Sequence, residues 1–228
     1  MSVLAALVLL ASGQGVRQDL WSYRTGLGVM LATKWLGLLA LAMAGVSLAL
    51  PAARAGRVVT LLFALVIGLC VSAVPFEFER RARSVPRIHD ITTDTRNPPQ
   101  FAAVLPLRAG APNTAAYGGA ELAELQRKAY PDIQPLVVQM PTQVAFSRAR
   151  DAAEGMGWQI VAADASAGRI EATARTFWFG FKDDVVVRIV PEGTGSRIDV
   201  RSVSRVGRSD LGTNARRIRE YLDRVRNF

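Results

Sequence analysis

The hydrophobic and polar positions of residues 168–205 alternate as they do in half-buried β-strands. In residues 168–176, the apolar positions Ile170, Ala172 and Ala174 fall on one side and the polar positions on the other, namely Arg169, Glu171, Thr173 and Arg175. Residues 181–190 and 197–205 repeat this alternation, and the turn-forming residues 191–195 separate them. Three consecutive strands on short loops predict an antiparallel meander.

After residue 205 the apolar positions change to a helical period. Ser209 is suited to cap a helix, and Asp210 would lie in its first turn, where the helix dipole favours a negative charge. The pattern predicts a helix that ends near Asn227, with an apolar stripe formed by Leu211, Ala215, Ile218, Leu222 and Val225. We expect this stripe to cover the apolar side of the sheet, which includes Ile170, Val187 and Val200.

The residues before this meander predict two further helices and two further strands. Residues 121–128 favour a short helix, and residues 136–139 and 158–163 favour strands. Between these strands, an apolar stripe predicts a helix that begins at Pro141-Thr142, with Phe146, Ala149, Ala153 and Met156 on one face. The predicted fold class is therefore α+β: a two-layer sandwich of about five antiparallel strands in the order β-α-β-β-β-β-α, with the helices on one face and charged residues on the bare face.

The first third of the chain predicts a transmembrane helical hairpin. Residues 31–50 and 58–74 are each apolar over about the length that crosses a bilayer, and Pro75 is expected to end the second span. Small residues would let the two helices pack closely, namely Gly37, Ala44, Gly45 and Gly68. Residues 3–11 are apolar over a length of only ~14 Å, too short to cross alone, and one interpretation is a span truncated by a late start site. The predicted organisation is a membrane anchor over residues 1–83, an extended segment over 84–118 and an α+β domain over 119–228.

The distribution of charge along the chain fits a membrane anchor and argues against a nucleic-acid partner. The chain has 228 residues, half of them hydrophobic, and a net charge of +9. Residues 1–83 hold eight basic and three acidic side chains, so only +4 belongs to the remainder. That remainder is mildly basic, and no aromatic residues are interleaved with the arginines of the last helix, so we expect no nucleic-acid partner. We expect a multi-pass protein of the cell inner membrane. Basic flanks favour cytoplasmic ends, but large domains translocate largely regardless of charge, so the side of the domain stays open.

Few residues in the chain are suited to metal or nucleophilic chemistry. Cys70 is the only cysteine and lies in an apolar span, and His89 is the only histidine. These counts exclude an internal disulfide and a two-histidine metal site. Asp183 and Asp184 are adjacent in a strand and would point to opposite faces. We therefore expect no catalytic residues, no metal and no cofactor.

The charged face and the start of the last helix provide a candidate ligand site. An anion could be held by Arg201 and Arg205 together with the free amides near Asp210 and Asn214. The alternative is a solvated lattice of cross-strand ion pairs. The candidate ligand-binding residues are Arg175, Asp184, Arg188, Arg201, Arg205, Asp210 and Asn214. The aromatic run at residues 177–181 favours core closure, with contact to the lipid interface or an apolar ligand as the alternatives.

Several ordered motifs resemble one known family. They comprise Ile88-His89-Asp90-Ile91-Thr92-Thr93-Asp94-Thr95, Pro98-Pro99, Phe101, Tyr130-Pro131-Asp132-Ile133, Trp158, Ile170-Glu171-Ala172, Phe181-Lys182-Asp183-Asp184, Asp199-Val200-Arg201-Ser202, Ser204-Arg205, Ser209-Asp210-Leu211-Gly212 and Asn214-Ala215. From about Ser84 to its end, the chain resembles the bacterial and plastid family called domain of unknown function 1499. The resemblance supports the fold and the envelope context, and it implies no activity.

The sequence favours a non-catalytic, membrane-anchored domain that binds an envelope component. Its expected partners are the lipid bilayer and either an anionic lipid or polymer or a partner membrane protein. One alternative is a hydrolase that uses Asp184 or Glu171 as its base, although no nucleophile or phosphate-binding loop accompanies them. The other alternative is a structural or assembly factor.

Overall fold

The computed structural model describes residues 1–227 and divides the chain into two compact units. The helical unit comprises Met1–Ser84 and the loop Thr176–Gly180. The α+β unit comprises Val85–Arg175 and the chain from Phe181 onward. Phe228, the final residue of the predicted α+β domain, lies outside the described residues.

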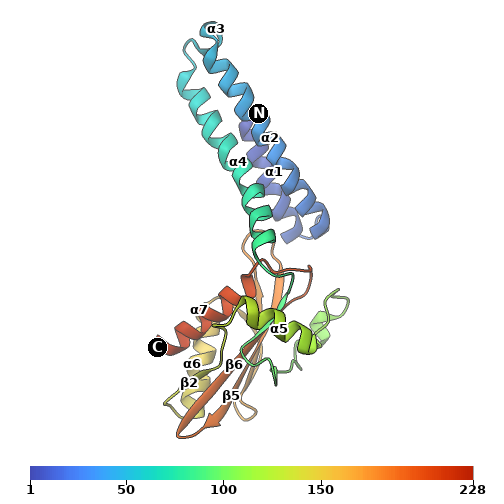
Figure 1. Cartoon of the computed structure of the whole chain (residues 1–228), viewed down its shortest axis with the longest axis vertical. Helices are drawn as coiled ribbons and strands as arrows, with labels where there is room; N and C mark the ends of the chain where they lie inside the picture. Colours follow the sequence, from blue (N-terminus) through green and yellow to red (C-terminus); the bar gives the residue numbers. More distant parts are fainter. Residues whose placement is uncertain (228) are drawn as a thin grey trace. The chain divides into compact units, whose positions relative to one another are not determined.

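Two long apolar helices dominate the helical unit (Figure 1). They are α2 (Tyr23–Ala49) and α4 (Val58–Ser84), joined through the short helix α3 (Pro51–Arg54), and α1 (Ser2–Arg17) packs against both. By length and composition, both α2 and α4 could cross a membrane. The predicted close packing of small residues is present at Gly37, where a β-carbon would contact the backbone of Gly68 and the Ser72 hydroxyl.

Both long helices extend beyond their predicted bounds. The first begins at Tyr23 rather than near residue 31, because the Ser22 hydroxyl accepts the N–H of Thr25 as a cap. The second passes through Pro75 and continues to Ser84, so the prediction that Pro75 ends it is wrong. Apolar helices tolerate an internal proline when their neighbours compensate for the lost hydrogen bond. Here the ion pair between Lys34 of α2 and Glu79 of α4, at 2.6 Å, holds the turn after the proline against α2.

The α+β unit contains an antiparallel sheet of six strands in the order β1-β6-β5-β4-β3, with β2 also paired to β6. The strands are β1 (Asp90–Thr92), β2 (Leu136–Val138), β3 (Gln159–Asp164), β4 (Arg169–Arg175), β5 (Lys182–Glu192) and β6 (Gly195–Ser204). The predicted meander is confirmed as β4, β5 and β6. Strand β1 is additional to the strands expected from the sequence, because the extended segment contributes Asp90–Thr92, which pairs with residues 201–203 of β6.

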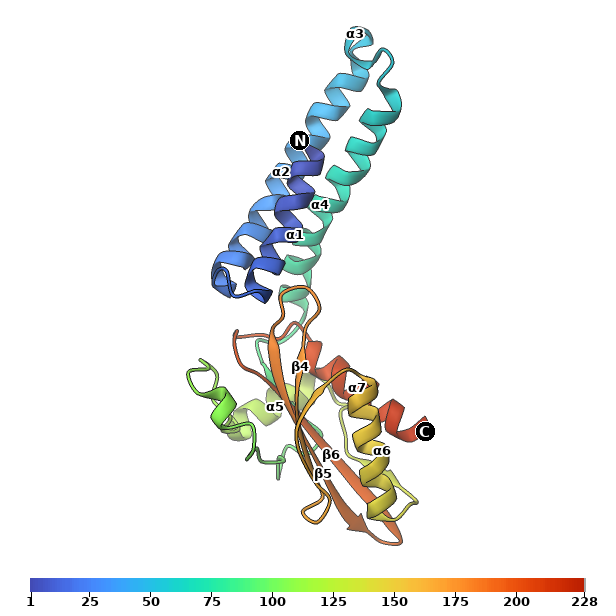
Figure 2. The same cartoon turned by 180° about the vertical axis from the view of Figure 1, so that it is seen from behind.

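Helices α6 (Thr142–Gly155) and α7 (Thr213–Asn227) lie side by side on one face of this sheet (Figure 2). The predicted apolar face is confirmed, because Ile170, Val187 and Val200 share one buried cluster with residues of both helices. Trp158 stacks on Tyr221 of α7 in the same core, with ring centroids 4.8 Å apart. Helix α7 begins at Thr213, four residues after the expected Ser209 cap. Leu211 and Gly212 adopt positive φ angles there, and the Asp210 carboxylate accepts the N–H of Asn214 in place of a serine cap.

The opposite face of the sheet is covered, which corrects the expectation that it is bare. The chain over residues 93–117, including the short helix η1 (Pro106–Arg108), lies across it, away from α6 and α7 (Figure 2). Phe101 and Val104 of this covering segment pack on Val186 and Val203 of the sheet. Helix α5 (Gly119–Ala129) follows the covering segment and holds β1, because the Gln126 amide bonds to both the N–H and the carbonyl of Thr92.

Candidate anion-binding pocket

The charges under the covering segment form buried ion pairs rather than a solvated lattice. Arg201 is fully buried, and its guanidinium donates to both carboxylate oxygens of Asp90 at 2.8 and 2.9 Å. It also donates to the carbonyl of Ala115 and lies over the rings of Phe101 and Tyr117, 5.2 and 5.4 Å from their centroids. A charge removed from water needs such partners, because an unpaired buried ion is costly. Arg201 therefore fixes the covering segment to the sheet.

Two further carboxylates on this face hold the same segment. Glu171 is fully buried and accepts the backbone N–H groups of Ala102, Ala103 and Val104, each at 3.0 Å. Asp184 accepts from Arg108 of the covering segment at 2.6 Å and from the Arg205 side chain at 2.8 Å. Both carboxylates proposed as hydrolase bases are therefore occupied by structural partners.

The structure does not bring the candidate anion site of Arg201, Arg205, Asp210 and Asn214 together. Arg201 and Arg205 pair with carboxylates under the covering segment. Asn214 bonds to Ser202 among the residues that point toward α7, and the Asp210 carboxylate already accepts the N–H groups of Gly212 and Asn214. Burial raises the pKa of the Asp210 carboxyl against the opposing effect of those two N–H groups.

The remaining predicted residues lie at separate places on the sheet. Arg175 is exposed at the end of β4, opposite Lys182. Arg188 is half-buried and bonds to Asp199 at 2.8 Å and to Asp94 at 3.2 Å. The two adjacent aspartates point to opposite faces as predicted, because Asp183 pairs with Arg217 of α7 while Asp184 pairs with Arg108.

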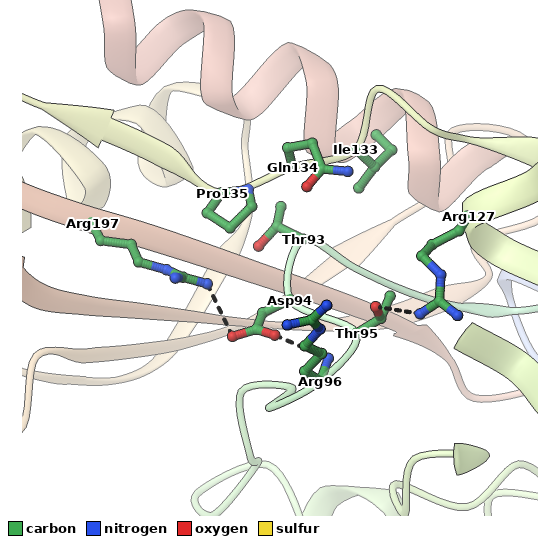
Figure 3. Close-up of a pocket in the computed structure, with 9 residues that line it drawn as sticks. All are labelled: Thr93, Asp94, Thr95, Arg96, Arg127, Ile133, Gln134, Pro135 and Arg197. Carbon is green, nitrogen blue, oxygen red and sulfur yellow. Dashed lines mark hydrogen bonds and ion pairs between the residues drawn. The ribbon is translucent and has the colours of Figure 1, made fainter. Parts of the chain in front are cut away.

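Beside Arg188, the charged face opens into a pocket of about 650 Å³ (Figure 3). Four separate stretches of chain surround it: the residues after β1, helix α5, the residues before β2, and β6. The lining residues are Thr93, Asp94, Thr95, Arg96, Arg127, Ile133, Gln134, Pro135 and Arg197. Three guanidinium groups against one carboxylate give the lining a formal charge of +2.

Asp94 organises the cationic side of the pocket. One carboxylate oxygen accepts the N–H groups of Arg96 and Asn97 at 3.0 and 2.9 Å, which closes a tight turn after β1. The other oxygen accepts from Arg197 at 3.0 Å. Partial burial acts to raise the pKa of Asp94, but the two N–H groups and the nearby guanidinium of Arg197 outweigh it and hold that pKa below its ordinary value. The carboxylate is therefore ionised at neutral pH and fixes Arg197.

Two of the three arginines in the pocket keep their charge available. Arg127 donates to the uncharged hydroxyl of Thr95 at 3.1 Å, and Arg96 is exposed at the rim. Within residues 1–227 neither forms an ion pair with a carboxylate, whereas Arg197 is engaged by both Asp94 and Asp199. A guanidinium with free N–H donors binds phosphate or carboxylate strongly and with defined geometry. The arrangement can therefore hold an anion.

The sequence pattern did not indicate Arg96 and Arg127 as binding residues. Asp94-Thr95-Arg96-Asn97 has the composition of a turn that an aspartate side chain closes, so Arg96 could have been placed at a loop tip. Nothing in the local pattern connects this turn to Arg127 or Arg197. Among the side chains of residues 1–227, no group of three or more histidines, cysteines, aspartates or glutamates is placed to hold a metal ion.

Comparison with known proteins identifies the α+β unit. A family model described as "Protein of unknown function (DUF1499)" matches residues 90–225. This match includes every strand and all nine residues that line the pocket. No curated protein matches the chain.

Proposed function

Because the chain belongs to the DUF1499 family, whose description names no activity, we propose a function from the geometry of the pocket. We propose that the protein is a membrane-anchored, non-catalytic module of the bacterial envelope that binds an anionic group. The observation that carries this proposal is that one pocket contains two guanidinium groups, Arg96 and Arg127, which form no ion pair with a carboxylate of residues 1–227. The ligand chemistry that fits is a phosphate or a carboxylate.

The exposed surface of the helical unit supports membrane anchoring. Large apolar side chains of α2 and α4 are exposed along both helices, including Trp35, Leu39, Met43, Leu62, Phe63, Val66 and Leu69. A contiguous apolar surface of this size is unusual for a soluble monomer. Each helix has 27 residues and a length of ~40 Å, enough to cross the ~30 Å hydrocarbon core. We therefore propose that α2 and α4 cross the inner membrane.

The pocket is suited to binding rather than to catalysis. Its lining provides cations, hydroxyl groups and one amide, and its one carboxylate is held in an ion pair with Arg197. A general base must face the substrate group whose proton it accepts, and a nucleophile needs such a base beside it. Asp94 instead accepts two backbone N–H groups and two guanidinium groups. The pocket therefore recognises charge without an evident reactive group.

Calorimetric titration of the full chain in detergent with tripolyphosphate tests this proposal. We expect Arg127→Gln to weaken binding by roughly tenfold or more, since hydrogen bonds to charged groups contribute about 1.5–3 kcal/mol. Arg96→Gln should weaken binding in the same direction. Arg216→Gln on α7, where an exposed arginine pairs with Glu220, is the matched control and should leave the affinity unchanged. Absence of heat from the unmodified chain at millimolar tripolyphosphate, or equal affinities for all three variants, would refute the pocket as the anion site.

A further inference from the structure

The loop Thr176–Gly180, which joins β4 to β5, is an integral part of the helical unit. The Arg17 side chain, at the last residue of α1, donates to the carbonyls of Thr176 and Phe177 at 3.0 and 2.8 Å. The Trp178 indole donates to the carbonyl of Leu10 at 3.2 Å. Two of these bonds hold the backbone of the loop and the third holds the Trp178 side chain, so the loop is attached to α1 at three points.

Two of the aromatic rings in this loop are seated against glycines of α1 and α2. The Trp178 ring lies so close to Gly13 that a β-carbon there would collide with it. Phe179 is buried, packs edge-on against Trp178 with centroids 4.9 Å apart, and lies against Gly26. The expectation that the aromatic run closes the core of the sheet is therefore wrong for Trp178 and Phe179, because both rings pack against helices α1 and α2.

Phe177 differs from its two neighbours, because its ring is 90 % exposed while its backbone carbonyl is held by Arg17. One exposed apolar side chain is ordinary on a protein surface, but an exposed ring that a fixed loop holds beside the exposed apolar side chains of α2 indicates an apolar partner. Leu20, three residues beyond Arg17 in the turn between α1 and α2, is also 68 % exposed. Both residues lie at the end of α1 where the chain turns into the first long apolar helix.

The residues around this turn have the composition of a membrane interface. Trp21 and Tyr23 provide amphipathic rings, and Arg17 and Arg24 provide positive charge next to the apolar length of α2. Aromatic residues concentrate at the headgroup level of membrane proteins, and arginines there contact lipid phosphates. The exposed apolar surface of α2 continues directly into this turn. One lipid bilayer would therefore contact both the apolar side of α2 and the turn.

We propose that Phe177 and Leu20 insert into the boundary between lipid headgroups and acyl chains, so that the Thr176–Gly180 loop is a second membrane contact beside the helices. This inference rests on the proposed crossing of the bilayer by α2 and α4. It identifies the partner as the interfacial region of a lipid bilayer. Arg17 is a positioning residue in this arrangement, because it holds the loop backbone and leaves the Phe177 ring free.

Fluorescence quenching in vesicles measures the depth of the loop directly. The full chain with Cys70→Ser, and with Phe177→Cys, Phe63→Cys or Glu124→Cys added singly, is labelled with an environment-sensitive dye. Each protein is reconstituted into vesicles of equal parts phosphatidylcholine and phosphatidylglycerol that contain nitroxide lipids, with the nitroxide either at the headgroup or deep in the acyl chain. Phe63 lies on the exposed side of α4 and reports the bilayer crossing, and Glu124 is an exposed charged residue of α5 that serves as the aqueous reference.

We expect the dye at position 177 to show a blue-shifted emission and to lose more fluorescence to the headgroup nitroxide than to the deep one. The dye at position 63 should lose more to the deep nitroxide, and the dye at position 124 should lose little to either. If position 63 is quenched but position 177 behaves like position 124, the loop inference is overturned while the bilayer crossing stands. If position 63 is not quenched, both fail. A blue shift at position 177 without quenching would show a protein contact, such as a second copy, and would also overturn the inference.

Discussion

Replacing Arg201 by methionine should strongly destabilise the α+β unit. The guanidinium is fully buried and donates to both oxygens of Asp90. Methionine has a similar length but no charge, so Arg201→Met leaves the Asp90 carboxylate buried without its counter-ion. The variant also removes the donor to the Ala115 carbonyl and the cation that contacts the rings of Phe101 and Tyr117.

The free energy of unfolding should fall by about 3–5 kcal/mol, which is the cost of removing one partner of a buried ion pair. The exposed fractions of the two side chains, 0 % for Arg201 and 5 % for Asp90, place the pair at the buried limit, where solvent does not screen it. For a unit of this size, 1 kcal/mol changes the unfolding midpoint by about 3 °C. We therefore expect the midpoint to fall by about 10–15 °C.

Thermal unfolding of the full chain in detergent, followed by near-ultraviolet circular dichroism, measures this change, because Trp158 is stacked on Tyr221 in the core of the unit. Arg175→Met is the matched control: it removes an exposed arginine from the sheet and should change stability by less than about 0.5 kcal/mol. The double variant Asp90→Asn with Arg201→Met should be more stable than Arg201→Met alone, since it also removes the unpaired charge. If Arg201→Met is as mild as Arg175→Met, the buried pair between Arg201 and Asp90 does not stabilise the unit.

Two further predictions concern the same unit. Burial raises the pKa of Tyr117 to about 12 from its ordinary value of 10.0, so its neutral form favours the folded state below pH 10 and this contribution is lost as the pH rises from 10 to about 12. Tyr117→Phe should lack that loss, and a constant difference in unfolding midpoint between variant and parent across this range would contradict the reasoning. Separately, Ala149 of α6 is fully buried against the sheet, so Ala149→Leu should overpack the core and cost about 1–3 kcal/mol in the same thermal assay. Val144→Leu on the exposed side of α6 is its control and should be nearly neutral.

The sheet and its two covering helices could be predicted because their patterns are local. Ile170, Val187 and Val200 alternate with polar residues, and this alternation assigns their side of each strand wherever the strand lies. The stripe of α6 includes Phe146, Ala149 and Ala153, all of which are buried. In these segments hydrophobic burial is the main driving force for folding, and the period of the apolar residues indicates which side of the element is buried.

The burial of the charged face could not be predicted from the sequence, because charged residues alternate with apolar residues in the same way whether the face is exposed to solvent or covered. An arginine that alternates with apolar residues looks solvent-exposed, and the charge partner that lets Arg201 be buried, Asp90, lies 111 residues earlier in the chain. The covering segment itself has no periodicity, since its backbone N–H groups bond to the Glu171 carboxylate instead of to a neighbouring strand. The pocket could not be predicted for the same reason, because the turn at Asp94, helix α5 and strand β6 meet only in the folded unit.

The buried ion pair and the pocket are linked through the register of β1. This strand has only three residues, and Asp90, Ile91 and Thr92 pair with Val203, Ser202 and Arg201 of β6. A slip by one residue would turn Asp90 into the apolar core and Ile91 toward the charged face, because side chains alternate along a strand. The bond from Arg201 to Asp90 excludes that slip, and it therefore determines where Thr93 and Asp94 begin the pocket. It follows that Arg201→Met, at a temperature where the unit stays folded, should weaken tripolyphosphate binding although Arg201 does not line the pocket. The control Arg175→Met should bind as the parent does, and equal affinities in both variants would show that the turn at Asp94 forms without the pair.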